Sequence, residues 1–372
     1  MAGAGLRNVA VAESRISSID GTRGILAYRG LDIHALAEHS TFEETAYLLH
    51  EGELPTRREL DEFSAALGRE RAVPDLALAV LRALPPGTHP MTALRTVVSA
   101  LEAADPDVAD NGPAACVRKS RRLIAQMATV VALIERHRQG APPVAPDPAL
   151  SHAANFLYML TGQRPSEGSA RAMDLALVLH ADHEFNASTF AARVAASTLA
   201  DVHGAIVAAI ATLKGPLHGG ANEAVMNMLE KIGSLDRIEG FLRDTFTRKQ
   251  KIMGFGHAVY RTEDPRATHL RPMSEKLGRE AGEPLFYEMS RRIEELVRKE
   301  KGLNPNVDFY SASAYHAMGI KTDLFTPVFA VSRIAGWTAH VLEQLADNKL
   351  IRPESDYVGR KDVRYVPIAE RG

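Results

Sequence analysis

Histidines in unusual local sequence are the first indication of chemistry in this 372-residue chain. His218 lies in the segment Gly-Pro-Leu-His-Gly-Gly, whose glycines and proline exclude a regular helix and require a sharp turn. The next residues predict a helix over 221–232, so the imidazole lies near the positive end of a helix dipole, which disfavours the protonated ring. A neutral imidazole at that place can donate a hydrogen bond to a carbonyl oxygen that becomes an enolate.

A second histidine, His257, follows two spaced glycines in the segment Lys-Ile-Met-Gly-Phe-Gly-His. Gly254 and Gly256 would let a ligand approach the main chain closely. Lys251 and Arg261 flank this turn and are suited to neutralise phosphate groups. No third glycine and no strand–helix unit accompany the pair, so the spacing does not indicate a Rossmann dinucleotide site. An ordinary glycine turn is the alternative interpretation.

An aspartate and two arginines complete the set of candidate residues. Asp308 precedes Phe309 and Tyr310, and an aspartate beside such apolar neighbours is partly desolvated and therefore a stronger base. The alternative is that Asp308 caps a helix. Arg333 lies in an apolar helical stretch, where a buried guanidinium needs an anion, so it is a candidate carboxylate clamp. Arg352 is a second candidate clamp.

Metal binding is the rival interpretation of a third motif, His-Ala-Asp-His-Glu. Its histidines, His180 and His183, are three positions apart and would share one face of a helix. The zinc-protease spacing is His-Glu-x-x-His, which this motif does not match. We therefore expect no metal site here.

Composition narrows the class of protein. Lysine and arginine number 44 against 46 aspartates and glutamates, so no basic excess indicates nucleic-acid binding. The single cysteine, Cys116, can form neither an intrachain disulfide nor a cysteine cage for a metal. Residues 1–11 lack the pattern of a secretion signal, and apolar runs such as 205–213 are too short to span a bilayer. We expect a cytoplasmic protein that binds neither nucleic acid nor membrane.

The elements that must position these residues are mostly helices. A Thr41 cap predicts a short helix over residues 41–50, and Pro284 fits the first position of another. Thr326 and Pro327 open a longer helix with Trp337 on its apolar stripe. The only clear strand signal is a small hairpin over residues 16–28, turning at Asp-Gly.

Taken in order along the chain, the motifs resemble the citrate synthase family. They are His-x-Asp-His-Glu, Gly-Pro-Leu-His-Gly-Gly-Ala-Asn, Gly-Phe-Gly-His-x-Val-Tyr, Asp-Pro-Arg, Asn-Val-Asp-Phe and Arg-Pro. The resemblance covers residues 16 to 357 and is to the short bacterial and archaeal form. It implies an all-α, two-domain helical fold with a minor N-terminal β-hairpin. We expect a large domain of residues 1–218 plus 327–372 and an inserted small domain of residues 219–326.

The resemblance also implies a role for each candidate residue. His218 would donate to the thioester carbonyl, Asp308 would take the methyl proton, and His257 would polarise the keto carbonyl and protonate the new alkoxide. The residues that would bind oxaloacetate are His183, His218, His257, Arg266, Arg333 and Arg352. The residues that would bind CoA are Lys251, Met253, Gly254, Phe255, Gly256 and Arg261.

The implied reaction joins acetyl-CoA to oxaloacetate and hydrolyses the product to citrate and CoA, without a cofactor or a metal. The implied assembly is a homodimer in which Arg352 crosses to the partner's site. A 2-methylcitrate synthase using propionyl-CoA is the alternative, since one methylene is worth only about 1–3 kcal/mol in a pocket and no catalytic motif need change. A non-catalytic acyl-CoA-binding module is the alternative from another class, but it would not require His218, His257 and Asp308 together.

Overall fold

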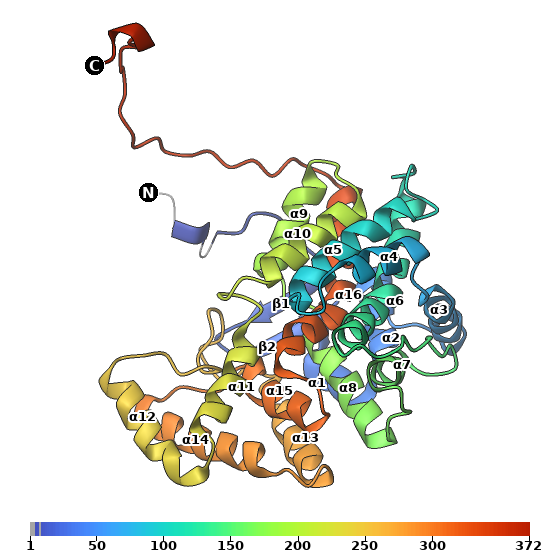
Figure 1. The fold of residues 1–372 in the computed structure, drawn as a ribbon, viewed down its shortest axis with the longest axis vertical. Helices are drawn as coiled ribbons and strands as arrows, with labels where there is room; N and C mark the ends of the chain where they lie inside the picture. Colours follow the sequence, from blue (N-terminus) through green and yellow to red (C-terminus); the bar gives the residue numbers. More distant parts are fainter. Residues whose placement is uncertain (1–3, 7–8) are drawn as a thin grey trace.

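Almost all regular structure in the computed structural model, which describes residues 4–6 and 9–372, is helical (Figure 1). The helices before the turn at His218 are α1 (Ile33–His39), α2 (Phe42–Glu51), α3 (Arg57–Glu70), α4 (Asp75–Ala83), α5 (Pro90–Ala103), α6 (Pro113–Arg138), α7 (His152–Thr161), α8 (Glu167–His180), α9 (Ala187–Ser197) and α10 (Val202–Leu213). Those after it are α11 (Ala221–Ile232), α12 (Ile238–Thr247), α13 (Ala267–Glu280), α14 (Leu285–Lys301), α15 (Val307–Ala317) and α16 (Phe325–Ala346). The predicted all-helical class is confirmed.

A small antiparallel sheet near the N-terminus confirms the predicted hairpin. Strand β1 (Ser17–Asp20) pairs with β2 (Ile25–Tyr28), and a third strand that we did not predict, β3 (Leu31–Asp32), follows on the other side of β2. The Asp20 carboxylate accepts two main-chain N–H bonds of 3.0 Å in the turn between β1 and β2. Such a local bond is a usual reason for aspartate at a turn.

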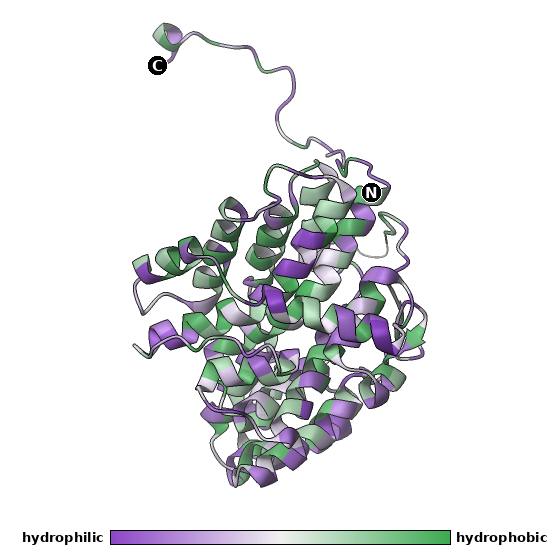
Figure 2. Ribbon diagram, turned by 90° about the vertical axis from the view of Figure 1, so that its right-hand side faces the viewer, coloured by the Kyte–Doolittle hydropathy of each residue, from purple (hydrophilic) through white to green (hydrophobic). Residues whose placement is uncertain are grey.

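The core is built around α16, which is buried on nearly all sides and packs against α2, α6, α8, α9 and α10. The helix begins at Phe325, one residue before the predicted Thr326–Pro327 start, and Trp337 is fully buried in it as expected. The helices in Figure 2 change between hydrophobic (green) and hydrophilic (purple) residues along their length, which is typical of amphipathic helices. Because most of α16 is buried, its backbone holds any functional side chain that it carries in a fixed place.

Two other predicted helix starts are also found. Thr41 caps α2 by accepting the N–H of Glu44 at 3.2 Å, as expected. Helix α14 begins at Leu285 and Pro284 is its cap residue, one position outside the predicted place, with Met289 and Ile293 buried on its inner face. The glycine-rich break also lies where it was predicted, between the end of α10 and the start of α11.

Helices α11, α13, α14 and α15 pack on one another in the lower part of Figure 1. This group meets the other helices where α11 contacts α16 and where α13 contacts α8. Residues 347–372 follow α16 and run away from the helices, with their side chains almost all exposed. Within residues 4–6 and 9–372, no helix combines the length and apolar character needed to cross a membrane.

Candidate active site

A pocket of about 1000 Å³ lies where segments from distant parts of the chain converge. Its wall includes β1, the α8–α9 connection, the turn between α10 and α11, the loop before α13, and residues of α15 and α16. The predicted site residues that line it are His183, His218, His257, Arg266, Asp308 and Arg333. The structure therefore brings all three predicted catalytic residues into one cavity.

His218 is held by Ser188, the second residue of α9. Its Nε2 accepts the Ser188 main-chain N–H at 3.3 Å and lies 2.8 Å from the Ser188 hydroxyl, which in turn accepts from the indole N–H of Trp337 at 3.0 Å. Because a main-chain N–H only donates, Nε2 is the acceptor and the proton is assigned to Nδ1. Burial, with a smaller effect of the Arg333 charge, lowers the pKa of His218 to about 4. The ring is thus a neutral donor through Nδ1.

His257 is the opposite tautomer. Its Nδ1 accepts the main-chain N–H groups of Val259 at 3.0 Å and Tyr260 at 3.2 Å, so the proton is assigned to Nε2. Burial, and then the charge of Arg266, lowers the pKa of His257 to about 4. A neutral ring that lines the pocket and carries its proton on Nε2 is suited to donate to a carbonyl oxygen.

His183 lies beside His257, with the two ring centres 5.3 Å apart. Its Nε2 is 3.2 Å from the hydroxyl of Tyr260, a residue that we did not predict. Burial, followed by the charge of Arg266, holds the pKa of His183 well below its usual range. Three neutral imidazoles therefore face one pocket.

Asp308 lies in the first turn of α15 and retains partial exposure to the pocket. The alternative that Asp308 caps the helix is wrong, because Asn306 is the cap and accepts the Asp308 N–H at 3.0 Å. Burial raises the pKa of Asp308 to about 6, with Asp264 adding to the rise while the charges of Arg266 and Arg333 oppose it. A carboxylate that titrates near neutrality is suited to general base catalysis.

Two buried guanidinium groups supply positive charge. Arg266 donates two bonds to Asp264, from Nε at 2.9 Å and from Nη2 at 2.8 Å, which fixes its plane. Arg333 donates from Nε to the His180 carbonyl at 2.7 Å and stacks on Phe329. Burial lowers the pKa of Arg333 to about 10. Both arginines line the pocket, and buried cations of this kind suit an anionic substrate.

The residues predicted to bind CoA do not line this pocket but lie on the same loop, before and after His257. Gly254 and Gly256 both have left-handed backbone, with φ of 80° and 77°. A Cβ on Gly254 would lie 2.7 Å from Phe309 and 2.8 Å from Val225, whereas the space beside Gly256 is open. Close packing is thus enough to require glycine at position 254. Of the two glycines, Gly256 is the one with room for a ligand beside its Cα.

Arg352 is not brought to the pocket of its own chain. It is exposed on residues 347–372, the segment that follows α16 and runs away from the helices (Figure 1).

Four residues that hold the site were missed from the sequence. They are Ser188, Tyr260, Asp264 and Asn306. Asp264 had a detectable signal, because a carboxylate two positions before an arginine in Asp-Pro-Arg is a ready ion-pair partner. Tyr260 is the last residue of the motif Gly-Phe-Gly-His-x-Val-Tyr, but no role was assigned to it. Ser188 had no such signal, since its partner His218 lies 30 positions later in the chain.

The fold and the site together define a mostly helical enzyme that can remove a proton from carbon and stabilise the resulting enolate beside a bound anion. No group of three or more His, Cys, Asp or Glu side chains placed to hold a metal ion occurs among residues 4–6 and 9–372.

Comparison with known proteins identifies the family. The family model described as "Citrate synthase, C-terminal domain" matches residues 5–354. Citrate synthases of Haloferax volcanii and Deinococcus radiodurans are 51% and 47% identical, each over 99% of this chain and 98% of the relative. A 2-methylcitrate synthase of Shewanella oneidensis is 42% identical over 100% of this chain and 98% of the relative.

Solved structures agree. Citrate synthase from Pyrobaculum aerophilum superimposes with a TM-score of 0.93 at 40% identity, covering 99% of this chain and 95% of that one. The ternary complex of the Thermoplasma acidophilum enzyme with carboxymethyl coenzyme A and oxaloacetate has the same TM-score at 35% identity, covering 99% of both chains. The chain belongs to the citrate synthase family, a family of acyltransferases.

Proposed function

We propose that this enzyme condenses acetyl-CoA with oxaloacetate and hydrolyses the resulting citryl-CoA to citrate and CoA. The observation that carries the proposal is the joint presence in one pocket of a base of raised pKa, Asp308, and two neutral imidazoles of opposite tautomer, His218 and His257. The reaction calls for no cofactor, because acid–base groups of the chain supply each proton transfer.

The first step is proton removal from the acetyl methyl group. A thioester α-proton is too weakly acidic for an aspartate acting alone, so the base needs a donor on the forming enolate oxygen. Asp308 takes the proton while Nδ1–H of His218 donates to that oxygen, and one preorganised donor of this kind is worth about 3 kcal/mol. The product is a neutral acid and a hydrogen-bonded enolate.

The second step forms the carbon–carbon bond. Nε2–H of His257 polarises the keto carbonyl of oxaloacetate and gives its proton to the alkoxide that forms. The ring then regains a proton from the Asp308 carboxyl group, which holds the one taken from the methyl group, so both groups return to their starting states. Arg266 and Arg333 hold the carboxylates and His183 donates beside them, which fixes the carbonyl in the path of the enolate. Water then attacks the citryl thioester, and the C–S bond breaks to give citrate and the CoA thiol.

The acyl preference is tested by thiol release with acetyl-CoA and propionyl-CoA in parallel. The 51% and 47% identical relatives are named citrate synthases, and the 2-methylcitrate synthase relative is 42% identical, which favours the acetyl substrate. We expect kcat/KM to be larger for acetyl-CoA. A larger value for propionyl-CoA would make the enzyme a 2-methylcitrate synthase, and no thiol release from either would refute the condensation, with His257→Ala as the inactive control.

We also propose that the pocket closes between two domains, residues 1–218 plus 327–372 and residues 219–326. His257 and Asp308 lie in the second part, whereas His183 and Arg333 lie in the first. Movement of one part on the other would assemble these residues around the substrate and exclude water. Small-angle scattering should show compaction when oxaloacetate is added, and an unchanged profile with saturating ligand would contradict closure.

Finally, we propose a homodimer in which Arg352 reaches the partner's pocket. The exposure of Arg352 and its absence from the lining of the pocket in its own chain support this. Mixing inactive Arg352→Ala and His257→Ala chains tests it. If the arginine acts across the interface, a mixed dimer has one complete site and regains activity; if it acts within its own chain, the mixture stays inactive.

A further inference from the structure

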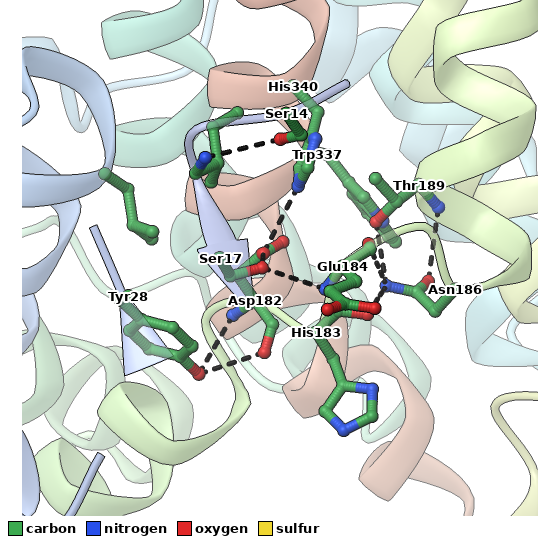
Figure 3. Close-up of polar contacts among 12 residues, drawn as sticks. Ser14, Ser17, Tyr28, Asp182, His183, Glu184, Asn186, Thr189, Trp337 and His340 are labelled. Carbon is green, nitrogen blue, oxygen red and sulfur yellow. Dashed lines mark hydrogen bonds and ion pairs between the residues drawn. The ribbon is translucent and has the colours of Figure 1, made fainter. Parts of the chain in front are cut away.

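One hydroxyl group joins the two residues on either side of His183. The Ser17 hydroxyl, on β1, donates to Oδ2 of Asp182 and accepts the main-chain N–H of Glu184 at 3.0 Å. Figure 3 shows the His183 ring pointing away from this group of polar contacts, while its neighbours in the chain point into it. The main chain around His183 is therefore fastened to a strand that lies about 165 positions earlier.

The Asp182 carboxylate has partners besides Ser17, although it is fully buried. Its Oδ2 lies 3.2 Å from Nε2 of His340, whose Nδ1 lies 3.3 Å from the guanidinium of Arg193. Because arginine only donates, Nδ1 of His340 accepts and Nε2 carries the proton given to Asp182. The Tyr28 hydroxyl donates to the Asp182 carbonyl at 3.0 Å and accepts the Asp182 N–H at 3.2 Å. Both side chain and main chain of Asp182 are thus fixed.

The residue on the other side, Glu184, has left-handed backbone with φ of 47°. For a residue with a Cβ this conformation costs roughly 1–2 kcal/mol, so surrounding contacts must hold it. Besides the bond to Ser17, its Oε1 accepts the main-chain N–H of Ile19 at 2.6 Å. Strand β1 therefore imposes the bend that turns the chain from His183 toward α9.

We infer that Ser17 and Asp182 are positioning residues that aim His183 at the keto acid. The reason is geometric: the pair fixes the main chain on both sides of one ring, and that ring meets Tyr260 at 3.2 Å inside the pocket. The inference rests on the proposed function, since it takes oxaloacetate as the ligand of His183. Loss of the pair should weaken oxaloacetate binding. Acetyl-CoA binding should stay nearly unchanged, because the loop around Lys251 belongs to another segment.

The first test is Ser17→Ala, with oxaloacetate binding measured by calorimetry and turnover measured for both substrates. We expect the Kd and the KM for oxaloacetate to rise about tenfold, the size of one lost bond to a charged group, with the KM for acetyl-CoA nearly unchanged. Ser17→Thr keeps the hydroxyl and should restore binding. Ser99→Ala is the matched control, because Ser99 is exposed on α5 and does not line the pocket.

Asp182→Asn gives a second test, in a double-mutant cycle with Ser17→Ala. Residues that act as one unit are non-additive, so the double variant should bind oxaloacetate about as weakly as the weaker single variant. If Asp182→Asn does not fold, the Ser17 series decides alone.

Three results would overturn the inference. The first is unchanged oxaloacetate binding in Ser17→Ala. The second is an equal rise in the KM values of both substrates together with a lower Tm. The third is oxaloacetate binding in Ser17→Thr that is as weak as in Ser17→Ala. In each case an active wild-type enzyme would leave the proposed function intact. A wild-type enzyme that neither binds oxaloacetate nor releases thiol would overturn both.

Discussion

The Asn306 side chain donates from Nδ2 to the carbonyl oxygen of Gly256 at 3.0 Å. Through Oδ1 the same side chain caps α15 by accepting the N–H of Asp308. One amide therefore ties the loop that carries His257 to the helix that carries the proposed base. The distance between the proposed acid and the proposed base is set in part by this residue.

Two variants of Asn306 should separate its two roles. Asn306→Asp keeps the capping oxygen but loses the donor to Gly256, so kcat/KM should fall about tenfold with stability preserved. Asn306→Ala loses both and should also lower the free energy of unfolding by about 1 kcal/mol, as expected for a lost helix cap. Steady-state kinetics and denaturant unfolding check this, and equal activity in the two variants and the wild type would contradict the linking role.

The dependence of activity on pH should report Asp308. Because its pKa is raised to about 6, the carboxylate is protonated below that pH and cannot act as base. The value of kcat/KM should therefore fall as pH decreases through about 6. The neutral His218 and His257 should not contribute until pH nears 4, where their own pKa values lie. A profile that is flat down to pH 5 would exclude Asp308 as the base in the free enzyme.

Asp308→Asn should remove activity without weakening the fold. Loss of a general base typically costs about 10²–10⁴-fold in rate. A raised pKa means that the folded state binds the proton more tightly than the unfolded state, so stability is lost as pH rises through the folded pKa. The uncharged variant escapes that loss, and its free energy of unfolding at pH 7 should equal or exceed the wild-type value. Thiol release and urea unfolding provide the check; near-normal turnover would rule out the assigned role.

Alanine at the two glycines before His257 should have unequal effects. At Gly256 the new Cβ meets open space, so only the left-handed backbone is penalised, by about 1 kcal/mol. At Gly254 the new Cβ also meets Phe309 and Val225, and such overpacking costs about 1–3 kcal/mol more. Thermal unfolding of both variants should therefore show the lower Tm for Gly254→Ala. The reverse order would mean that this loop is not packed as described.

The sequence by itself was enough to predict the helical class, the N-terminal hairpin and six of the residues that line the pocket. Those features are local: helix periodicity, a Thr41 cap, and glycines and prolines that force turns beside His218 and His257 are all visible over a few neighbouring residues.

The protonation state and the orientation of the side chains in the pocket were decided only by the tertiary structure. The tautomer of His218 depends on Ser188, the aim of His183 on Ser17, and the link between acid and base on the bond from Asn306 to Gly256. These partners lie 30 to 167 positions apart in the chain. The pKa shifts have the same origin, because burial is the property of a packed fold and no short stretch of sequence contains it.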